Sequence, residues 1–202
     1  MNPPKDTLTP DYFDAVYRAN EDPWQFATSP YERDKYAATL AAMPRPVYES
    51  GFEIGCSIGV LTQQLAPRCR RLLAVDVSEA ALKQARQRLA DQPQVRLEQM
   101  VLPGEFPDES FDLILLSEVG YYWSMEDLLK AQTKLIDHLQ PGGHLLLVHW
   151  TPQVHDYPLT GDQVHDAFMA KTGDGQPLQH LFHRREDKYR LDLFTAPPPP
   201  AA

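Results

Sequence analysis

The most informative segment of the chain is Glu53-Ile54-Gly55-Cys56-Ser57-Ile58-Gly59. It joins an apolar run at residues 51–54 to a helical pattern at residues 60–66. Glycines at positions 55 and 59 allow the backbone to turn sharply and to approach a ligand closely. The helix that follows presents free N–H groups at its start. A glycine turn alone is a weak signal, because a plain strand–helix connection has the same composition, so its meaning depends on the flanking sequence.

Strands and helices alternate on the C-terminal side of this segment. Helical patterns at residues 79–90 and 125–139 separate four further apolar runs, at residues 71–75, 95–101, 111–117 and 144–150. Ser78 is suited to cap the first of these helices, and Pro141-Gly142-Gly143 is a stop signal for the second. Alternation of this kind predicts a parallel sheet with right-handed crossovers.

The last part of the chain breaks the alternation. Residues 178–185 and 188–195 read as two strands joined by a tight turn at Glu186-Asp187, so the final strand is expected to run antiparallel. We therefore predict an α/β, Rossmann-like fold with a mostly parallel seven-stranded sheet, helices on both faces and an antiparallel C-terminal hairpin. Before it, one helix is expected at residues 31–43, where Pro44 and Pro46 end it.

Length and charge exclude several classes of protein. The 202 residues suffice for one domain with a full core. Asp and Glu outnumber Lys and Arg by 28 to 19, for a net charge of −9, which argues against nucleic-acid and anionic-membrane partners. No run approaches the roughly 18 apolar residues of a membrane span, and we expect a cytoplasmic protein without a signal peptide. Cys56 and Cys69 are too few for a disulfide scaffold.

An acid at the end of the second strand completes a nucleoside-binding pattern. Asp76 stands 21 residues after Gly55, where a carboxylate can accept both ribose hydroxyls. A dinucleotide-binding turn requires Gly-x-Gly-x-x-Gly, but here Ser57 stands at the third position of that pattern, and Gly59 stands where it has no glycine. Glu53, in contrast, repels phosphate and suits a ligand with an ammonium or sulfonium group. We therefore favour S-adenosylmethionine over a nicotinamide dinucleotide, although a dehydrogenase stays an alternative.

These motifs resemble those of class I S-adenosylmethionine-dependent methyltransferases. The match comprises Glu53-x-Gly55-x-x-x-Gly59, Asp76, the strand at residues 111–117 and Leu139-x-Pro141-Gly142-Gly143. Further stretches are similar to the nodulation protein S (NodS) family, over roughly residues 11–195: Asp22-Pro23-Trp24, Ser29-Pro30-Tyr31-Glu32-Arg33-x-Lys35-Tyr36, Leu116-Ser117-Glu118-Val119-x-Tyr121-Tyr122, His149-Trp150 and Tyr157-Pro158-Leu159-x-Gly161-Asp162. Those rhizobial enzymes N-methylate the free amine of a deacetylated chitooligosaccharide.

The resemblance implies a cofactor site and a domain plan. Residues 1–46 would form a helical cap over the cofactor, residues 47–196 the methyltransferase domain and residues 197–202 a disordered Pro-rich tail. The expected cofactor-binding residues are Trp24, Tyr31, Arg33, Tyr36, Glu53, Gly55, Cys56, Ser57, Gly59, Asp76, Val77, Val101, Leu102, Ser117 and Glu118. Arg33 or Lys35 would pair with the methionine carboxylate, or else these residues only dock their helix on the domain. The chain lacks the Asp that often binds adenine, so packing against Met100 and Leu102 is expected instead.

The acceptor site is expected outside the carboxyl ends of the strands. Its candidate side chains are Tyr121, Tyr122, Trp150, Tyr157 and Asp162, of which the aromatic ones either stack on a sugar or pack under the cap. An amine attacks in its neutral form, so a base is useful. We name Glu118 first, then His149 and His165, although His165 is alternatively a solvated helix residue.

The expected function is transfer of a methyl group from S-adenosylmethionine to the amine of an amino sugar or chitooligosaccharide-like acceptor, leaving S-adenosylhomocysteine. The alternatives are an O- or N-methyltransferase for another small metabolite and a non-catalytic S-adenosylmethionine-binding protein. No metal is expected, because His149, His155 and His165 lack a firm ligand spacing. The sequence carries no signal for oligomeric state.

Overall fold

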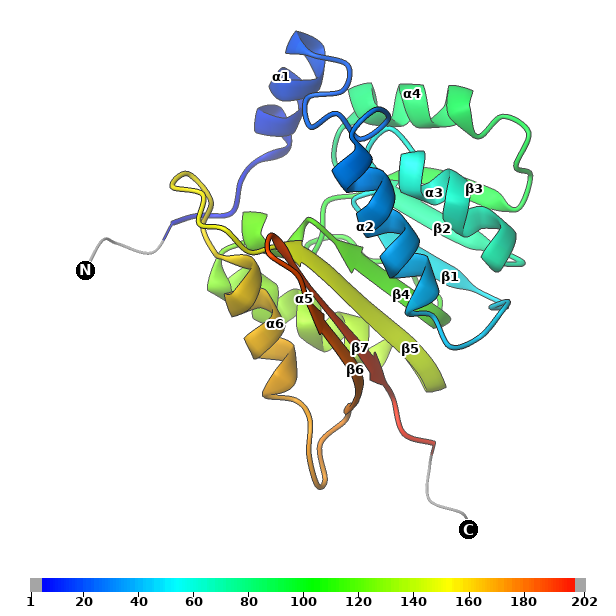
Figure 1. Ribbon diagram of the computed structural model, residues 1–202, viewed down its shortest axis with the longest axis vertical. Coiled ribbons are helices and arrows are strands. Elements are labelled where there is room, and N and C mark those ends of the chain that lie inside the picture. The colour runs from blue at the N-terminus through cyan, green and yellow to red at the C-terminus, as the bar shows by residue number, and fades with distance from the viewer. Residues whose placement is uncertain (1–4, 199–202) are drawn as a thin grey trace.

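The computed structural model describes residues 5–198 and has one mixed sheet at its centre (Figure 1). The strand order is β3-β2-β1-β4-β5-β7-β6, in which β1 to β5 pair parallel and β7 pairs antiparallel with both β5 and β6. The strands are β1 (Gly51–Ile54), β2 (Leu72–Asp76), β3 (Val95–Gln99), β4 (Phe111–Ser117), β5 (Leu139–Trp150), β6 (Gln179–Arg185) and β7 (Tyr189–Thr195). The predicted α/β architecture with its antiparallel C-terminal hairpin is confirmed.

Helices lie on both faces of the sheet. They are α1 (Pro10–Ala19), α2 (Pro30–Ala41), α3 (Val60–Leu65), α4 (Glu79–Arg88), α5 (Met125–Asp137) and α6 (Gly161–Met169), with short 3-10 turns η1 (Ala66–Arg68) and η2 (Gly120–Tyr122). Hydroxyl side chains of Ser78, Ser124 and Thr160 accept hydrogen bonds from the first turns of α4, α5 and α6. Such caps satisfy donors that a helix start would otherwise leave unpaired.

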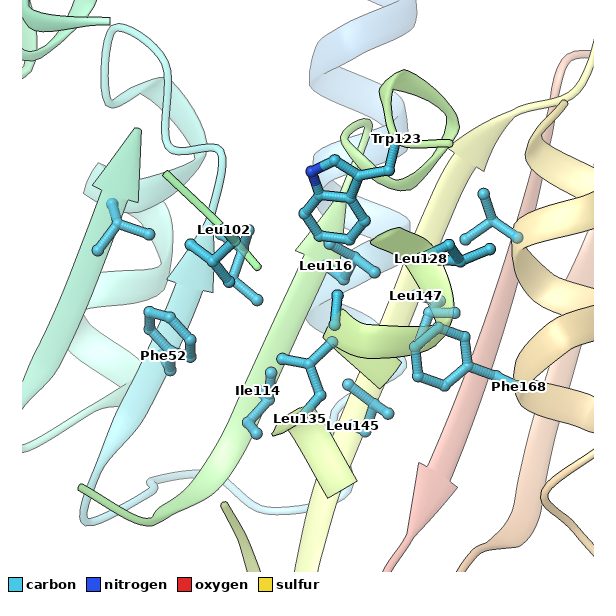
Figure 2. Packing of buried hydrophobic residues seen from close by; sticks show 14 of the residues in the cluster. Phe52, Leu102, Ile114, Leu116, Trp123, Leu128, Leu135, Leu145, Leu147 and Phe168 are labelled. Carbon is cyan, nitrogen blue, oxygen red and sulfur yellow. The ribbon is translucent and has the colours of Figure 1, made fainter. Parts of the chain in front are cut away.

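The apolar core has two layers because both faces of the sheet are covered. Figure 2 shows one layer, in which Phe52, Ile114 and Leu145 of the strands pack against Leu135 of α5 and Phe168 of α6. The other layer sets Leu113, Leu115, Leu146 and Val148 against α2 and α3, through Tyr36, Leu61 and Leu65. Full burial of one such side chain contributes about 1.5–3 kcal/mol, so the sheet is firmly held where it carries the site.

Two helices and one strand differ from the sequence-based expectation. Helix α1 was not predicted, although Pro10 stands at its first position, where proline suits a helix. Helix α6 was not predicted either, although Thr160 and Gln163 form a capping box. Strand β5 begins at Leu139 rather than residue 144, because the chain enters the sheet through a register irregularity that takes up Pro141-Gly142-Gly143.

Two expectations concern the ends of the chain and the membrane. Of the predicted tail, residues 199–202 lie outside the described residues, and the same is true of residues 1–4 of the predicted cap. The division into a cap and a core domain stays a prediction. Among residues 5–198, no helix combines the length and the apolar composition that crossing a bilayer requires.

Candidate active site

A cavity of about 410 Å³ opens at the carboxyl ends of β1, β2 and β4. Ligands of open α/β sheets bind at this edge, and small-molecule sites commonly enclose about 300–1,000 Å³. The N-terminal segment supplies one wall, which includes Phe13, Tyr17, Trp24, Tyr31 and Lys35, and the loops after the strands supply the other. The cavity is therefore enclosed by two parts of the chain that are distant in sequence.

The turn after β1 is a tight one and leaves its backbone close to the cavity. Gly55 and Gly59 both have a φ of 78°, a conformation in which glycine carries no steric penalty. A Cβ atom at Gly55 would overlap Val119 from the loop after β4. Ser57 adopts a φ of 51°, and its Oγ lies 2.5 Å from the hydroxyl of Tyr17. Ser57 thus tolerates the left-handed conformation and ties the turn to α1.

Asp76 lies at the tip of β2 and faces the cavity. Its carboxylate accepts the backbone N–H of Ser57 at 2.8 Å and that of Ser78 at 2.9 Å. Burial raises the pKa of Asp76 to about 6. An ionised carboxylate has about four acceptor positions, so two remain for a ligand's hydroxyl groups.

Glu53 has an unpaired oxygen beside this cavity. Glu53 is 2% exposed, and its Oε2 has no hydrogen-bond partner within residues 5–198, although the buried hydroxyl of Thr62 lies near enough to favour the charged form. Burial outweighs this contact and raises the pKa of Glu53 to about 7. Glu53 borders a hollow of about 30 Å³ that shares Gly55, Ser57 and Glu118 with the main cavity. A buried acceptor without a donor is costly, so this position is suited to a ligand that brings an ammonium group.

Glu118 follows β4 and is held by three donors. Lys35 donates to its Oε1 at 2.6 Å, while Oε2 accepts the hydroxyl of Tyr121 at 2.6 Å and the backbone N–H of Trp150 at 2.8 Å. Lys35 also donates to Glu32 at 3.0 Å. Burial opposes the charge of Lys35, but the two carboxylates outweigh it and hold its pKa above the ordinary value. The carboxylate of Glu118 is therefore fixed in place at the cavity wall.

Aromatic rings form the part of the cavity beyond Glu118. The rings of Tyr121 and Tyr157 stack with centroids 5.1 Å apart, and Tyr122 meets Tyr157 edge-on at 4.8 Å. Trp150 and Tyr31 pack edge-on at 5.7 Å, and the buried hydroxyl of Tyr31 has no partner. This chamber offers flat apolar surfaces together with a few polar atoms, which is typical of small-molecule sites.

Most of the predicted site residues meet around these two hollows. The main cavity is lined by Trp24, Tyr31, Gly55, Ser57, Asp76, Val77, Val101, Leu102, Ser117, Glu118, Tyr121, Tyr122, Trp150 and Tyr157. The smaller hollow is lined by Tyr36, Glu53 and Cys56. Gly59 lines neither and acts through the shape of the turn. The contributions of Phe13 and Tyr17 are missed because α1 is not predicted, although Pro10 was the available signal. The contribution of Phe26, which lies between α1 and α2, is missed as well.

Four predicted site residues are located elsewhere. The guanidinium of Arg33 is exposed and pairs with Asp34, and the carboxylate of Asp162 pairs with Arg185 and Arg190 outside the cavity. His149 and His165 are fully buried behind the cavity wall, so they have no access to a substrate. The corresponding expectations of carboxylate binding by Arg33, substrate contact by Asp162 and base catalysis by the two histidines are corrected.

The two histidines instead belong to a buried hydrogen-bonded chain. His149 accepts the backbone N–H of Gly120 at 3.1 Å through Nε2, and its Nδ1 lies 3.0 Å from Nε2 of His165. His165 in turn contacts Asp192 at 2.6 Å. Burial lowers the pKa of both imidazoles, which favours their neutral forms. Their role is to support η2, which carries Tyr121.

The sheet order, the glycine turn and the acid at the tip of β2 together define a class I methyltransferase fold with a nucleoside-type cavity. The family model for nodulation protein S (NodS) matches residues 15–152. This chain therefore belongs to the NodS family.

Relatives and solved structures agree with this assignment. Nodulation protein S of Rhizobium tropici is 32% identical over 63% of this chain and 55% of its own length. Nodulation protein S of Bradyrhizobium diazoefficiens is 33% identical over 63% of this chain and 62% of its own length. The matches thus span somewhat more than half of these relatives. The crystal structure of the N-methyltransferase NodS from Bradyrhizobium japonicum WM9 with S-adenosylhomocysteine superposes with a TM-score of 0.77, at 26% identity, over 91% of this chain and 97% of that one. The crystal structure of a Pseudomonas syringae protein is 39% identical and superposes with a TM-score of 0.71, over 82% of this chain and 98% of that one.

Proposed function

We propose that this chain is an S-adenosylmethionine-dependent N-methyltransferase acting on the amine of an amino sugar. The observation that carries this proposal is a cavity, with an adjoining smaller hollow at Glu53, whose lining offers two chemistries. Asp76 and the neighbouring Glu53 offer acceptors for the hydroxyl and ammonium groups of an adenosyl amino acid. Glu118 and the aromatic chamber lie beyond them, where an acceptor molecule would enter. Membership in the NodS family supports the same reading.

The residues present suit the ribose, the ammonium group and the adenine of the cofactor. Asp76 has two acceptor positions free for the ribose hydroxyls, and the unpaired Oε2 of Glu53 suits the ammonium group. Met100, Val101 and Leu102 give an apolar surface for adenine. When bound, S-adenosylmethionine supplies an electrophilic methyl group on a sulfonium. The aromatic wall of Tyr17 and Trp24 would exclude water from this group.

Glu118 would position the attacking amine. Lys35, Tyr121 and the backbone of Trp150 occupy three of its acceptor positions, which leaves about one for an N–H of the acceptor. A negative charge at this point also favours the positive charge that grows on the amine nitrogen as it is methylated. Correct placement of two reacting groups can supply about 7–11 kcal/mol of a barrier at best. Glu118 would hold the amine and receive or pass on its proton.

The aromatic chamber supports a saccharide as the carrier of this amine. The stacked rings of Tyr121 and Tyr157, with Trp150 opposite, match the flat apolar faces of a sugar ring. Rings of this kind also attract a cationic ammonium through their negative faces, by about 0.5–2 kcal/mol. The Bradyrhizobium japonicum relative described as the N-methyltransferase NodS supports an amine as the attacking group.

Transfer of a labelled methyl group to a panel of acceptors tests this function. The panel contains glucosamine, a partly deacetylated chitooligosaccharide, their N-acetylated counterparts and simple alcohols. Label on the free-amine sugars alone supports the proposal. Label on hydroxyl acceptors, or tight binding of S-adenosylhomocysteine without any transfer, contradicts it. A thermal-shift comparison of S-adenosylhomocysteine with NAD tests the cofactor independently of the acceptor.

A further inference from the structure

Two histidines and one aspartate come together on the C-terminal hairpin, away from the cavity. His180 Nε2 lies 2.7 Å from Asp192 Oδ1, and His183 Nδ1 lies 2.9 Å from the same oxygen. The three atoms are all within 4.8 Å of one another. The first two belong to β6 and the third to β7, and none of the three residues lines either hollow of the candidate active site.

A bulge in β6 creates this arrangement. Residues three apart in a regular strand point to opposite faces of the sheet. The pairing of β6 with β7 shifts between His180 and Phe182, so Leu181 is the extra residue. His183 is then opposite Asp192, and His180 is opposite Phe194, two residues further along β7. Bulges re-aim side chains in this way, and here both imidazoles are brought to the face that carries Asp192.

Asp192 is held rigidly from behind. Its side chain is fully buried, and its second oxygen, Oδ2, contacts His165 Nδ1 at 2.6 Å and accepts a hydrogen bond from Arg190 Nε at 2.7 Å. Outer-shell partners of this kind fix a metal-ligating carboxylate and leave its other oxygen aimed at the site. Within residues 5–198, the hydrogen-bonding contacts of Oδ1 are with the two histidines.

The surroundings tolerate an added positive charge and give access from solvent. Arg190 also pairs with Asp162 and Asp166, and Arg185 pairs with Asp162. Together with Asp192, these make three carboxylates against two guanidinium groups. The side chain of His183 is 46% exposed and that of His180 is 25% exposed. A hydrated cation can therefore reach the histidines while the carboxylate stays buried.

We propose that His180 Nε2, His183 Nδ1 and Asp192 Oδ1 bind a divalent transition-metal ion of the Zn²⁺ class. Two imidazoles and one carboxylate are ligands that zinc accepts, with one water completing a tetrahedral shell. Ligands about 2.0–2.1 Å from zinc stand roughly 3.3 Å apart. To bind the ion, each imidazole nitrogen therefore moves away from Asp192 Oδ1, and the two nitrogens, which lie within 4.8 Å of one another, draw together. Each neutral imidazole then carries its N–H on the nitrogen that does not bind the metal. The three-residue spacing of His180 and His183 does not by itself indicate a metal site, because only the bulge brings the two histidines to one face.

The bound ion joins the edge strand to the buried chain that reaches the cavity wall. Asp192, His165 and His149 link the site to the backbone of Gly120, at the start of the turn that carries Tyr121. The expected consequence is a stiffer C-terminal hairpin, with the ion in a structural role.

Titration of ZnCl₂ into tag-free, full-length protein after chelator treatment tests this site. Isothermal calorimetry is expected to give one ion per chain with submicromolar affinity. The double variant His180→Gln with His183→Gln is expected to lose about 100-fold or more in affinity. The variant His155→Gln, whose imidazole is exposed on a distant loop, is the matched control and is expected to bind normally.

Two further readouts keep the test decisive. Co²⁺ is expected to give visible absorption bands with the wild type that the double variant lacks. Zinc is also expected to raise the melting temperature of the wild type but not of the double variant. If the double variant does not fold, the single variant His183→Gln takes its place. Equal zinc affinity in wild type and variant, or no binding below millimolar zinc, overturns the proposal and leaves these contacts as a hydrogen-bonded network.

Discussion

Lys35 of α2 and Glu118 at the tip of β4 form an ion pair of 2.6 Å across 83 positions of the sequence. The Lys35 side chain is 2% exposed, and that of Glu118 is 14% exposed. The pair holds the N-terminal segment against the sheet and at the same time fixes the carboxylate that faces the aromatic chamber. Closure of the cavity and placement of the acceptor group are thus coupled through one contact.

Substitution Lys35→Met tests this contact. It keeps the apolar stem but leaves Glu32 and Glu118 without their cation. Removal of one partner from a buried pair typically costs about 3–5 kcal/mol. We expect a loss of this order in the free energy of unfolding, measured with urea. Arg33→Ala on the same helix removes only an exposed pair and is expected to change stability by less than about 0.5 kcal/mol. Similar losses in both variants would contradict the assignment.

Asp76→Ala is expected to weaken the binding of S-adenosylhomocysteine strongly. Hydrogen bonds to a charged group contribute about 1.5–3 kcal/mol, which corresponds to about 10- to 150-fold in dissociation constant. Calorimetry measures the change, and circular dichroism checks that the overall secondary structure is retained. The control Asp162→Ala removes a carboxylate outside the cavity and should leave the affinity unchanged. An unaltered constant in Asp76→Ala would refute the placement of the ribose.

Glu118→Gln is expected to reduce turnover while it preserves cofactor affinity. The amide keeps the shape of the side chain, but its NH₂ group faces a donor, because all three neighbours of Glu118 donate hydrogen bonds. Loss of a well-placed acid–base group typically lowers rates by about 10²- to 10⁴-fold. Single-turnover kinetics with a saturating amino sugar measure the effect. Turnover at the wild-type rate would show that Glu118 neither holds the amine nor handles its proton.

The parts of the fold that could be predicted are those that local chemistry specifies. The runs at residues 111–117 and 51–54 are predominantly apolar and form fully buried central strands. Helix α1 is not predicted because only two of its residues, Phe13 and Tyr17, are buried, and they pack on distant parts of the chain. The start of β5 was misplaced because glycine and proline are ambiguous between a turn and a bulged strand.

For single residues of the site, too, local structure could be predicted from the sequence and tertiary packing could not. Gly55 and Asp76 were recognisable because their roles follow from the backbone turn and the strand end on which they lie. Arg33 and His165 were misassigned because the sequence does not reveal which side of a helix faces the cavity. Residue type alone suggested a carboxylate partner and a base, whereas tertiary packing placed one in solvent and the other in the core.

Burial of Glu53 makes the stability of the ligand-free protein depend on pH. Its pKa is raised from 4.5 to about 7, so folding favours the protonated form. This contribution is complete below pH 4.5 and is lost as the pH rises through 7. It amounts to at most about 3 kcal/mol. We expect the stability of the Glu53→Gln variant not to decline in this way as the pH rises. At pH 8 its melting temperature should therefore exceed that of the wild type. Asp76, with a pKa of about 6, is present in both proteins and is ionised in each at pH 8.

Affinity for S-adenosylhomocysteine should change with pH in the opposite direction. The ammonium group of the ligand is a partner for the ionised form of Glu53, which predominates in the free protein only above about pH 7. Binding at lower pH must first remove a proton, so the dissociation constant is expected to rise about tenfold for each pH unit below 7 while Glu53 is the only group involved. Calorimetry between pH 6 and 8 in buffers of different ionisation enthalpy measures both the affinity and the proton released. In Glu53→Gln, binding should be weaker at pH 8, with no proton release near pH 7. A wild-type affinity that stays constant over this range, with no proton exchanged, would exclude an ammonium partner for Glu53.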